Sequence, residues 1–155
     1  MNAPTKTTWI LVADHARARL FELTSQNDKL SEIETFVNPE GRGPARDQTT
    51  DRLPRVRESM NSAHHAIEPH TSLHDKSADR FARELHETLE RGRIAHRYER
   101  LVLAAPPQFL GTLRLALGKH VRECVVAELP HELTTKRPEE IRAHLPKELQ
   151  LKIAG

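Results

Sequence analysis

The residues best suited to binding chemistry gather in residues 38–73, a segment without the apolar periodicity of a helix or a strand. The candidate binding residues are its arginines and histidines: Arg42, Arg46, Arg52, Arg55, Arg57, His64, His65 and His70. A guanidinium group can hold a phosphate through two parallel hydrogen bonds, so the cluster predicts contact with a phosphate-bearing partner. The alternative is a solvated loop whose arginines are neutralised by its own acidic residues, Glu40, Asp47, Asp51, Glu58 and Glu68.

Prolines and glycines interrupt this segment at Pro39, Gly41, Gly43, Pro44, Pro54 and Pro69. They predict one long loop over residues 38–73. Connections longer than about 12–15 residues are uncommon in compact domains unless they are functional or disordered. The segment contains no aromatic residue. Base stacking is therefore not predicted, which leaves contact with the shape or the backbone of structured RNA as the nucleic-acid mode.

Catalytic patterns are absent from the sequence. Asp14 ends the first expected strand, where ribonuclease-H-like enzymes place a metal ligand, but the fourth expected strand ends in Ala104-Ala105-Pro106-Pro107 without an acid. A two-metal site needs several convergent carboxylates, so we interpret Asp14 as a residue that caps its own turn. The histidines near His70 lack the HExxH spacing, and no metal or other cofactor is predicted. No GxSxG motif and no phosphate-binding glycine loop occurs, so we predict neither a catalytic residue nor a small-molecule substrate.

Composition limits the number of domains, the possible partners and the expected location of the protein. The chain of 155 residues fits one domain, and its formal net charge of +2 gives little general attraction to nucleic acid. The single cysteine, Cys124, excludes an internal disulfide and suits a buried thiol in an apolar strand. The apolar run from Trp9 to Ala13 is too short for a signal sequence or a membrane span, so we expect a cytoplasmic protein without a membrane partner.

The expected elements alternate after an initial run of strands. Strands are expected at Trp9–Ala13, Arg17–Leu23, Leu30–Val37, Leu101–Ala105 and within Val121–Leu129, and helices at about 75–92, Phe109–Leu117 and Pro138–His144. Three strands joined by short turns form an antiparallel meander, and two βα units follow. The predicted fold is a single α/β domain with a mixed five-stranded sheet flanked by helices.

The second half of the chain carries a resemblance to a known family. Its stretch SADRFARELHETLERGRIAHRYERLVLAAPPQFLGTLRLAL, with WILVADHARARLFEL and NPEGRGPARDQTTDR before it, resembles the host attachment proteins, described as required for attachment to host cells. The resemblance runs from Trp9 to Leu145. That family is similar in fold to the middle domain of archaeal and eukaryotic peptide-chain release factors, which implies a release-factor-like or ribonuclease-H-like topology. The release-factor loop carries a GGQ tip, which this chain lacks, so peptidyl-tRNA hydrolysis is not implied.

Three functions follow as expectations. The first is a non-enzymatic cytoplasmic interaction protein whose arginine-bearing loop docks on the ribosome or on other structured RNA. The alternative is a factor required for bacterial attachment to host cells, acting indirectly or through regulation. The weaker alternative is a metal-dependent hydrolase acting on RNA or a nucleotide. A homodimer formed through a sheet edge or the loop is compatible with each of them.

Overall fold

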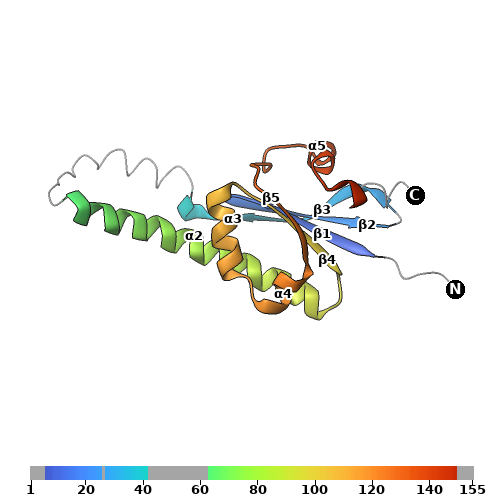
Figure 1. Ribbon diagram of the computed structural model, residues 1–155, viewed down its shortest axis with the longest axis horizontal. Helices are drawn as coiled ribbons and strands as arrows, with labels where there is room; N and C mark the ends of the chain where they lie inside the picture. Colours follow the sequence, from blue (N-terminus) through green and yellow to red (C-terminus); the bar gives the residue numbers. More distant parts are fainter. Residues whose placement is uncertain (1–5, 26, 42–62, 150–155) are drawn as a thin grey trace.

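The three antiparallel strands and two βα units form one mixed sheet in the computed structural model, which describes residues 6–25, 27–41 and 63–149 (Figure 1). Side chains are described for all of these except residues 27–28 and 63–75. The strands are β1 (Thr7–Ala13), β2 (Arg17–Thr24), β3 (Asn27–Val37), β4 (Arg100–Ala104) and β5 (Val125–Leu129). Their order in the sheet is β3-β2-β1-β4-β5. The α/β class and the five-stranded mixed sheet are therefore confirmed.

β1 lies at the centre of the sheet because its residues are apolar on both faces. From Thr8 to Ala13 every residue is buried. β1 runs antiparallel to β2, with Ile10 opposite Phe21, and parallel to β4, with Ile10 opposite Val102. A strand covered on both faces is expected to be apolar throughout. Because β4 and β5 also run parallel, the carboxyl ends of β1, β4 and β5 meet at one end of the sheet.

The helices cover the two faces unequally (Figure 1). One face carries α2 (Ala63–Ile94), α3 (Pro107–Ala116) and α4 (Lys119–Cys124). There, side chains such as Trp9, Leu85 and Leu113 form the larger core. The other face is covered by α5 (Pro138–Ala143), whose Ile141 joins a smaller core. Apolar residues recur at helical spacing on α2 and α3, which explains why these two helices pack against the larger core.

Two sequence predictions were wrong at element boundaries. α2 begins at Ala63, so residues 63–73 belong to a helix and not to the expected loop. The prolines had argued for a loop there, yet Pro69 lies within α2. Cys124, expected as the first residue of the last strand, is instead the last residue of α4, and β5 pairs with β4 from Val125 onward.

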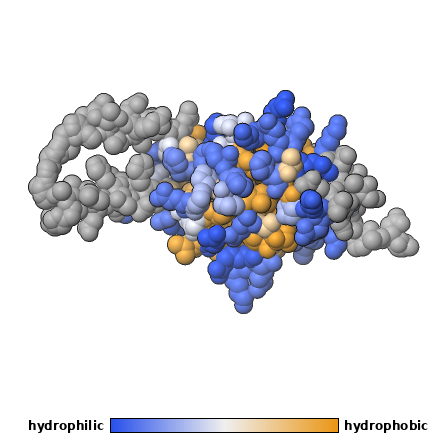
Figure 2. Space-filling view, turned by 45° about the horizontal axis from the view of Figure 1, so that its top comes forward, coloured by the Kyte–Doolittle hydropathy of each residue, from blue (hydrophilic) through white to orange (hydrophobic). Residues whose placement is uncertain are grey.

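The surface view shows hydrophobic side chains in the middle of the visible face, with hydrophilic ones around them (Figure 2). Among the described residues, the large exposed hydrophobic side chains are Val37, Ile94, Leu115 and Val126. They belong to four different elements, β3, α2, α3 and β5. A few exposed apolar residues of this kind are normal for a folded protein.

Candidate functional site

The candidate site lies at the carboxyl end of the parallel strands, where the chain leaves β3 for the arginine-bearing residues. Asn38 follows β3 directly and is buried. Its side-chain amide donates hydrogen bonds to the His15 carbonyl (2.8 Å) and to Ser77 Oγ of α2 (3.1 Å), while its backbone N–H donates to Ala16 O (2.8 Å). Asn38 therefore ties the exit of β3 to the β1–β2 turn and to α2.

A short 3₁₀ helix, η1 (Pro39–Gly41), continues from Asn38 and packs against the same turn. Gly41 is buried, and a Cβ atom there would overlap the backbone carbonyl oxygen of His15. Glu40 forms an ion pair with Arg80 of α2. Only a glycine permits this close approach, so Gly41 lets η1 lie directly against the β1–β2 turn.

Asp14 shapes the turn on which these residues rest. Its Oδ1 accepts hydrogen bonds from the backbone N–H groups of Ala16 (2.8 Å) and Arg17 (2.9 Å). Asp side chains commonly stabilise turns in this way. The interpretation of Asp14 as a residue that caps its own turn is confirmed.

A second carboxylate, Glu132, lies beside Asp14 after β5. Thr134 bridges the pair, with its Oγ 3.3 Å from Asp14 Oδ2 and 3.0 Å from Glu132 Oε2. Burial raises the pKa of Glu132 above its ordinary value, and the hydrogen bond with Asp14 raises it further. Burial acts in the same sense on Asp14, but hydrogen bonds from Glu132 and the two turn amides outweigh it and lower its pKa. Asp14 is thus the more acidic carboxyl of the pair, and Glu132 is the one that takes up a proton first as the pH falls.

Arg19 of β2 fastens the segment after β5 to the sheet. Its guanidinium group donates to the carbonyls of Thr134 (2.9 Å) and Lys136 (2.8 Å) and forms a two-point ion pair with Glu32 of β3, at 3.1 and 3.0 Å. The hydrogen bonds from Arg19 hold the pKa of Glu32 below its ordinary value. Planar guanidinium groups suit such multiple acceptors. Thr134 and the Asp14–Glu132 pair are positioned by this clamp.

The Asp14–Glu132 pair does not extend to a candidate metal centre among the described residues. Within the described part of the chain, no three His, Cys, Asp or Glu side chains lie together so that they could hold a metal ion. The carboxylates of Asp14 and Glu132 are already occupied by each other, by Thr134 and by the turn amides. A two-metal site would need more free carboxylates than these.

The structure describes the backbone of some of the predicted binding residues and leaves the others outside its described ranges. Arg42, Arg46, Arg52, Arg55 and Arg57 lie outside the described residues. His64, His65 and His70 lie on α2, and their side chains are not described. Their roles stay predictions. The neighbour of Asp14 that sequence reasoning missed is Glu132, and no local signal links two residues so distant in the chain.

Cys124 differs from its predicted setting. It is the last residue of α4, half-buried, and its Sγ lies 3.6 Å from the His120 carbonyl oxygen. Burial raises the pKa of the thiol. A raised pKa lowers the fraction of reactive thiolate.

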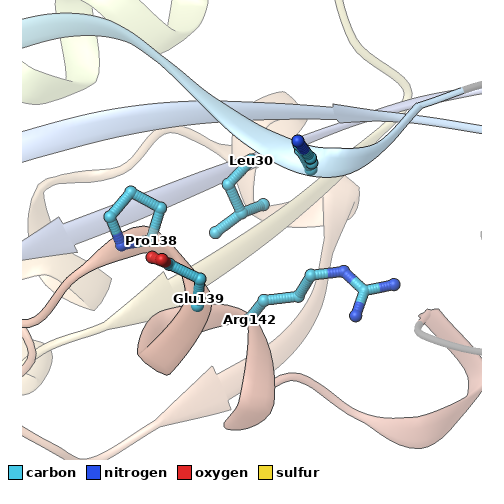
Figure 3. Close-up of a pocket in the computed structure, with 5 residues that line it drawn as sticks. Leu30, Pro138, Glu139 and Arg142 are labelled. Carbon is cyan, nitrogen blue, oxygen red and sulfur yellow. The ribbon is translucent and has the colours of Figure 1, made fainter.

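A pocket of about 390 Å³ lies on the other face, between β3 and α5. Lys29, Leu30, Pro138, Glu139 and Arg142 line it, and Figure 3 shows the Arg142 side chain extending away from Glu139. Small-molecule sites usually combine an apolar wall with polar groups that converge. Because these two charged groups diverge, the pocket is a weaker candidate than the carboxyl end of the sheet.

Comparison with known proteins identifies the family of the chain but names no binding partner. Among the described residues, no helix is both long enough and apolar enough to cross a membrane. The chain has no significant match among curated proteins. The model of one family, described as "protein required for attachment to host cells", matches residues 9–145, and the chain therefore belongs to this family.

Proposed function

We propose that this protein acts in attachment to host cells as a binding module, and that its docking surface is the carboxyl end of the sheet. The family description supports the attachment role. Crevices outside the carboxyl ends of parallel strands are the usual binding positions of open α/β sheets, which supports the location. The absence of catalytic patterns in the sequence favours binding over chemistry.

One observation carries the location. The segment that leads into residues 42–62 is anchored at three points, by Asn38 on His15 and Ser77, by Gly41 on the His15 carbonyl, and by Glu40 on Arg80. Such anchoring gives the arginine-bearing segment a defined starting point on a rigid support. Rigid support of a binding segment reduces the entropy lost when a partner is bound.

An attachment assay tests the role. A strain that lacks the protein should adhere less to host cells, and the wild-type chain should restore adhesion. A variant with Arg52, Arg55 and Arg57 replaced by Ala should fail to restore adhesion. The control variant, with the exposed Arg83, Arg91 and Arg122 replaced by Ala, loses the same charge elsewhere and should restore adhesion. Full adhesion by the deleted strain would contradict the proposal.

We also propose a cytoplasmic location and an indirect role in attachment. The apolar run from Trp9 to Ala13 supports it, because this run is buried in the central strand β1 and is thus part of the folded core. Cell fractionation distinguishes an indirect role from a direct one, because a protein that itself binds the host cell must reach the cell surface. Recovery of the protein in the surface fraction would overturn the indirect role and leave the attachment role standing.

Structured RNA, including the ribosome, is the second candidate partner. Its support is the anchored exit of β3 toward five arginines, together with the resemblance to release-factor middle domains. Binding should fall steeply with salt because phosphate contacts release counterions. Co-sedimentation with ribosomes at low and high salt measures this, with the two arginine triples above as variant and control. Absence of binding at low salt would remove this candidate.

The topology proposed for the chain is that of the release-factor middle domain or of ribonuclease H. A strand order of β3-β2-β1-β4-β5, with a meander followed by two parallel strands, supports it. This likeness keeps a metal-dependent hydrolase as the weaker alternative, with Asp14 at the end of β1. RNA cleavage that EDTA abolishes and that Asp14→Asn removes would favour the hydrolase over a binding module.

A further inference from the structure

We propose that His131 and His144 form a two-histidine site for one divalent transition-metal ion such as Zn²⁺. The two rings lie 5.6 Å apart between centroids and are tilted by 51°. His131 lies in the segment after β5, and His144 directly follows α5. The inference is independent of the attachment and RNA proposals.

The separation of the rings suits a shared ion. Zinc binds imidazole nitrogen at about 2.0–2.1 Å with near-tetrahedral angles, which places two ring centroids on one ion about 5 Å apart. The observed 5.6 Å is close to this separation, and both side chains are exposed and can turn.

The hydrogen bond of His144 prepares it as a ligand. Its Nδ1 lies 3.0 Å from the Glu140 carbonyl oxygen. A carbonyl oxygen can only accept, so Nδ1 carries the hydrogen, and in the neutral ring Nε2 carries the lone pair. Metal-binding histidines typically donate their second nitrogen to a carbonyl or a carboxylate in this way, which fixes the tautomer and the ring orientation.

Both histidines sit on firmly packed backbone. The N–H of His131 donates to Leu129 O (2.8 Å) and the N–H of His144 donates to Ile141 O (3.0 Å). The neighbouring side chains of Leu133, Ile141 and Leu145 are buried in the core beneath α5. A preformed ligand pair loses less freedom on binding a metal than a pair on a loose segment.

Other described histidines show why this pair stands out. His86 Nδ1 accepts the hydrogen bond of the Gly118 N–H at 3.2 Å, so its lone pair is already used. His120 Nδ1 on α4 lies 3.6 Å from the Glu123 carboxylate, so it pairs with an acid and not with a second imidazole. Because no described group of three ligating side chains exists, water or a group from a partner would complete the coordination. Imidazole ligands favour Zn²⁺, Cu²⁺ or Ni²⁺ over Mg²⁺ or Ca²⁺.

Zinc sulfate titrated into the purified full chain, followed by NMR of the imidazole nitrogens, tests the site. Each ring has its own signal, so binding by histidines elsewhere in the chain is read separately. The His131 and His144 signals should shift together, with one common midpoint. His131→Gln should raise the zinc concentration that shifts His144 by about tenfold or more, and His144→Gln should do the same for His131.

His120→Gln is the matched control, because it removes another exposed imidazole from α4 and should leave the common midpoint unchanged. Circular dichroism checks that each variant folds, and the wild-type titration stands without any variant. Different midpoints for the two rings, or an unchanged His144 response in His131→Gln, would show independent surface histidines and overturn the shared site.

Discussion

The two ends of the sheet are held together by different interactions. At the end where β4 begins, Trp9 stacks on Tyr98 with ring centroids 4.6 Å apart, and Gly92 leaves the space that the indole ring fills. The Tyr98 hydroxyl donates to the Leu89 carbonyl at 2.7 Å, and Arg97 lies over the indole at 5.2 Å. Burial raises the pKa of Tyr98, as expected for a phenol enclosed by apolar groups.

The opposite end depends on polar side chains. Asp14, Glu132 and Thr134 hold the segment after β5, and Asn38 holds the exit of β3. Net hydrogen-bond contributions are about 1 kcal/mol each, whereas a buried aromatic side chain contributes several times more. Proton binding and a partner's charges can alter polar contacts but hardly affect an aromatic stack. The comparison therefore assigns more of the stability to the aromatic end, while the polar end is the one that we propose for binding.

Trp9→Ala is the largest expected loss. It removes the stacked indole and leaves a cavity, which should lower the free energy of unfolding by about 3–5 kcal/mol. Urea denaturation followed by circular dichroism measures it. Leu115→Ala, at a side chain that is 90% exposed, is the control and should change it by less than about 0.5 kcal/mol. Similar losses in both variants would contradict the role given to the aromatic end.

Gly41→Ala tests how closely η1 approaches the β1–β2 turn. The new Cβ would overlap the His15 carbonyl oxygen, a backbone atom that cannot rotate away. We expect a loss of about 1–3 kcal/mol. Gly111→Ala is a matched control, because nothing lies within 4 Å of its Cβ position and α3 should gain up to about 1 kcal/mol. A neutral Gly41→Ala would show that the anchor is loose.

Asn38→Ala should have a smaller effect than the glycine substitution. It deletes the side-chain hydrogen bonds to His15 O and Ser77 Oγ, for a loss of about 1–2 kcal/mol. Amide hydrogen exchange adds a local measurement, since the N–H groups around Ala16 should exchange faster while those around Tyr98 stay protected. Thr112→Ala, whose hydroxyl lies at 3.3 Å from the Gln108 carbonyl on α3, is the control. Equal changes at both ends would show that the anchoring is not local.

Sequence patterns predicted the aromatic end better than the polar end. The apolar run beginning at Trp9 and the stripe of Phe81, Leu85 and Leu89 have periodicities that specify a strand and a helix. The meander, α3 and α5 followed from turn residues and prolines at the expected positions. Such signals are local in the sequence, and the apolar face that they define is the face that becomes buried.

The polar end depends on contacts between distant residues. Asp14 was recognised as a turn residue from its neighbours, but its pairing with Glu132 arises only when β4 pairs with both β1 and β5, so that the ends of these strands meet. The start of α2 was missed because Pro69 and the polar residues around it resemble a loop. The roles of the arginines from Arg42 to Arg57 stay predictions, since these residues lie outside the description.

Glu132→Gln should have the smallest effect on stability. It tests whether the stability of the polar end depends on pH. Burial and the Asp14 hydrogen bond raise the Glu132 pKa above its ordinary 4.5, so its contribution to stability is complete below that pH. That contribution is lost as pH rises through the folded-state pKa, because Glu132 must then ionise beside Asp14.

A glutamine cannot ionise and can donate to Asp14 at every pH. Wild type and Glu132→Gln should therefore have equal unfolding free energies near pH 4, and the variant should be more stable at pH 7, by less than about 1 kcal/mol given the partial exposure. Thermal unfolding from pH 4 to 8 measures the difference, and Glu84→Gln on the exposed face of α2 is the charge-matched control. A difference that stays constant with pH would mean that the two carboxylates do not share a proton. The polar end would then have lost the property that most clearly distinguishes it from the aromatic one.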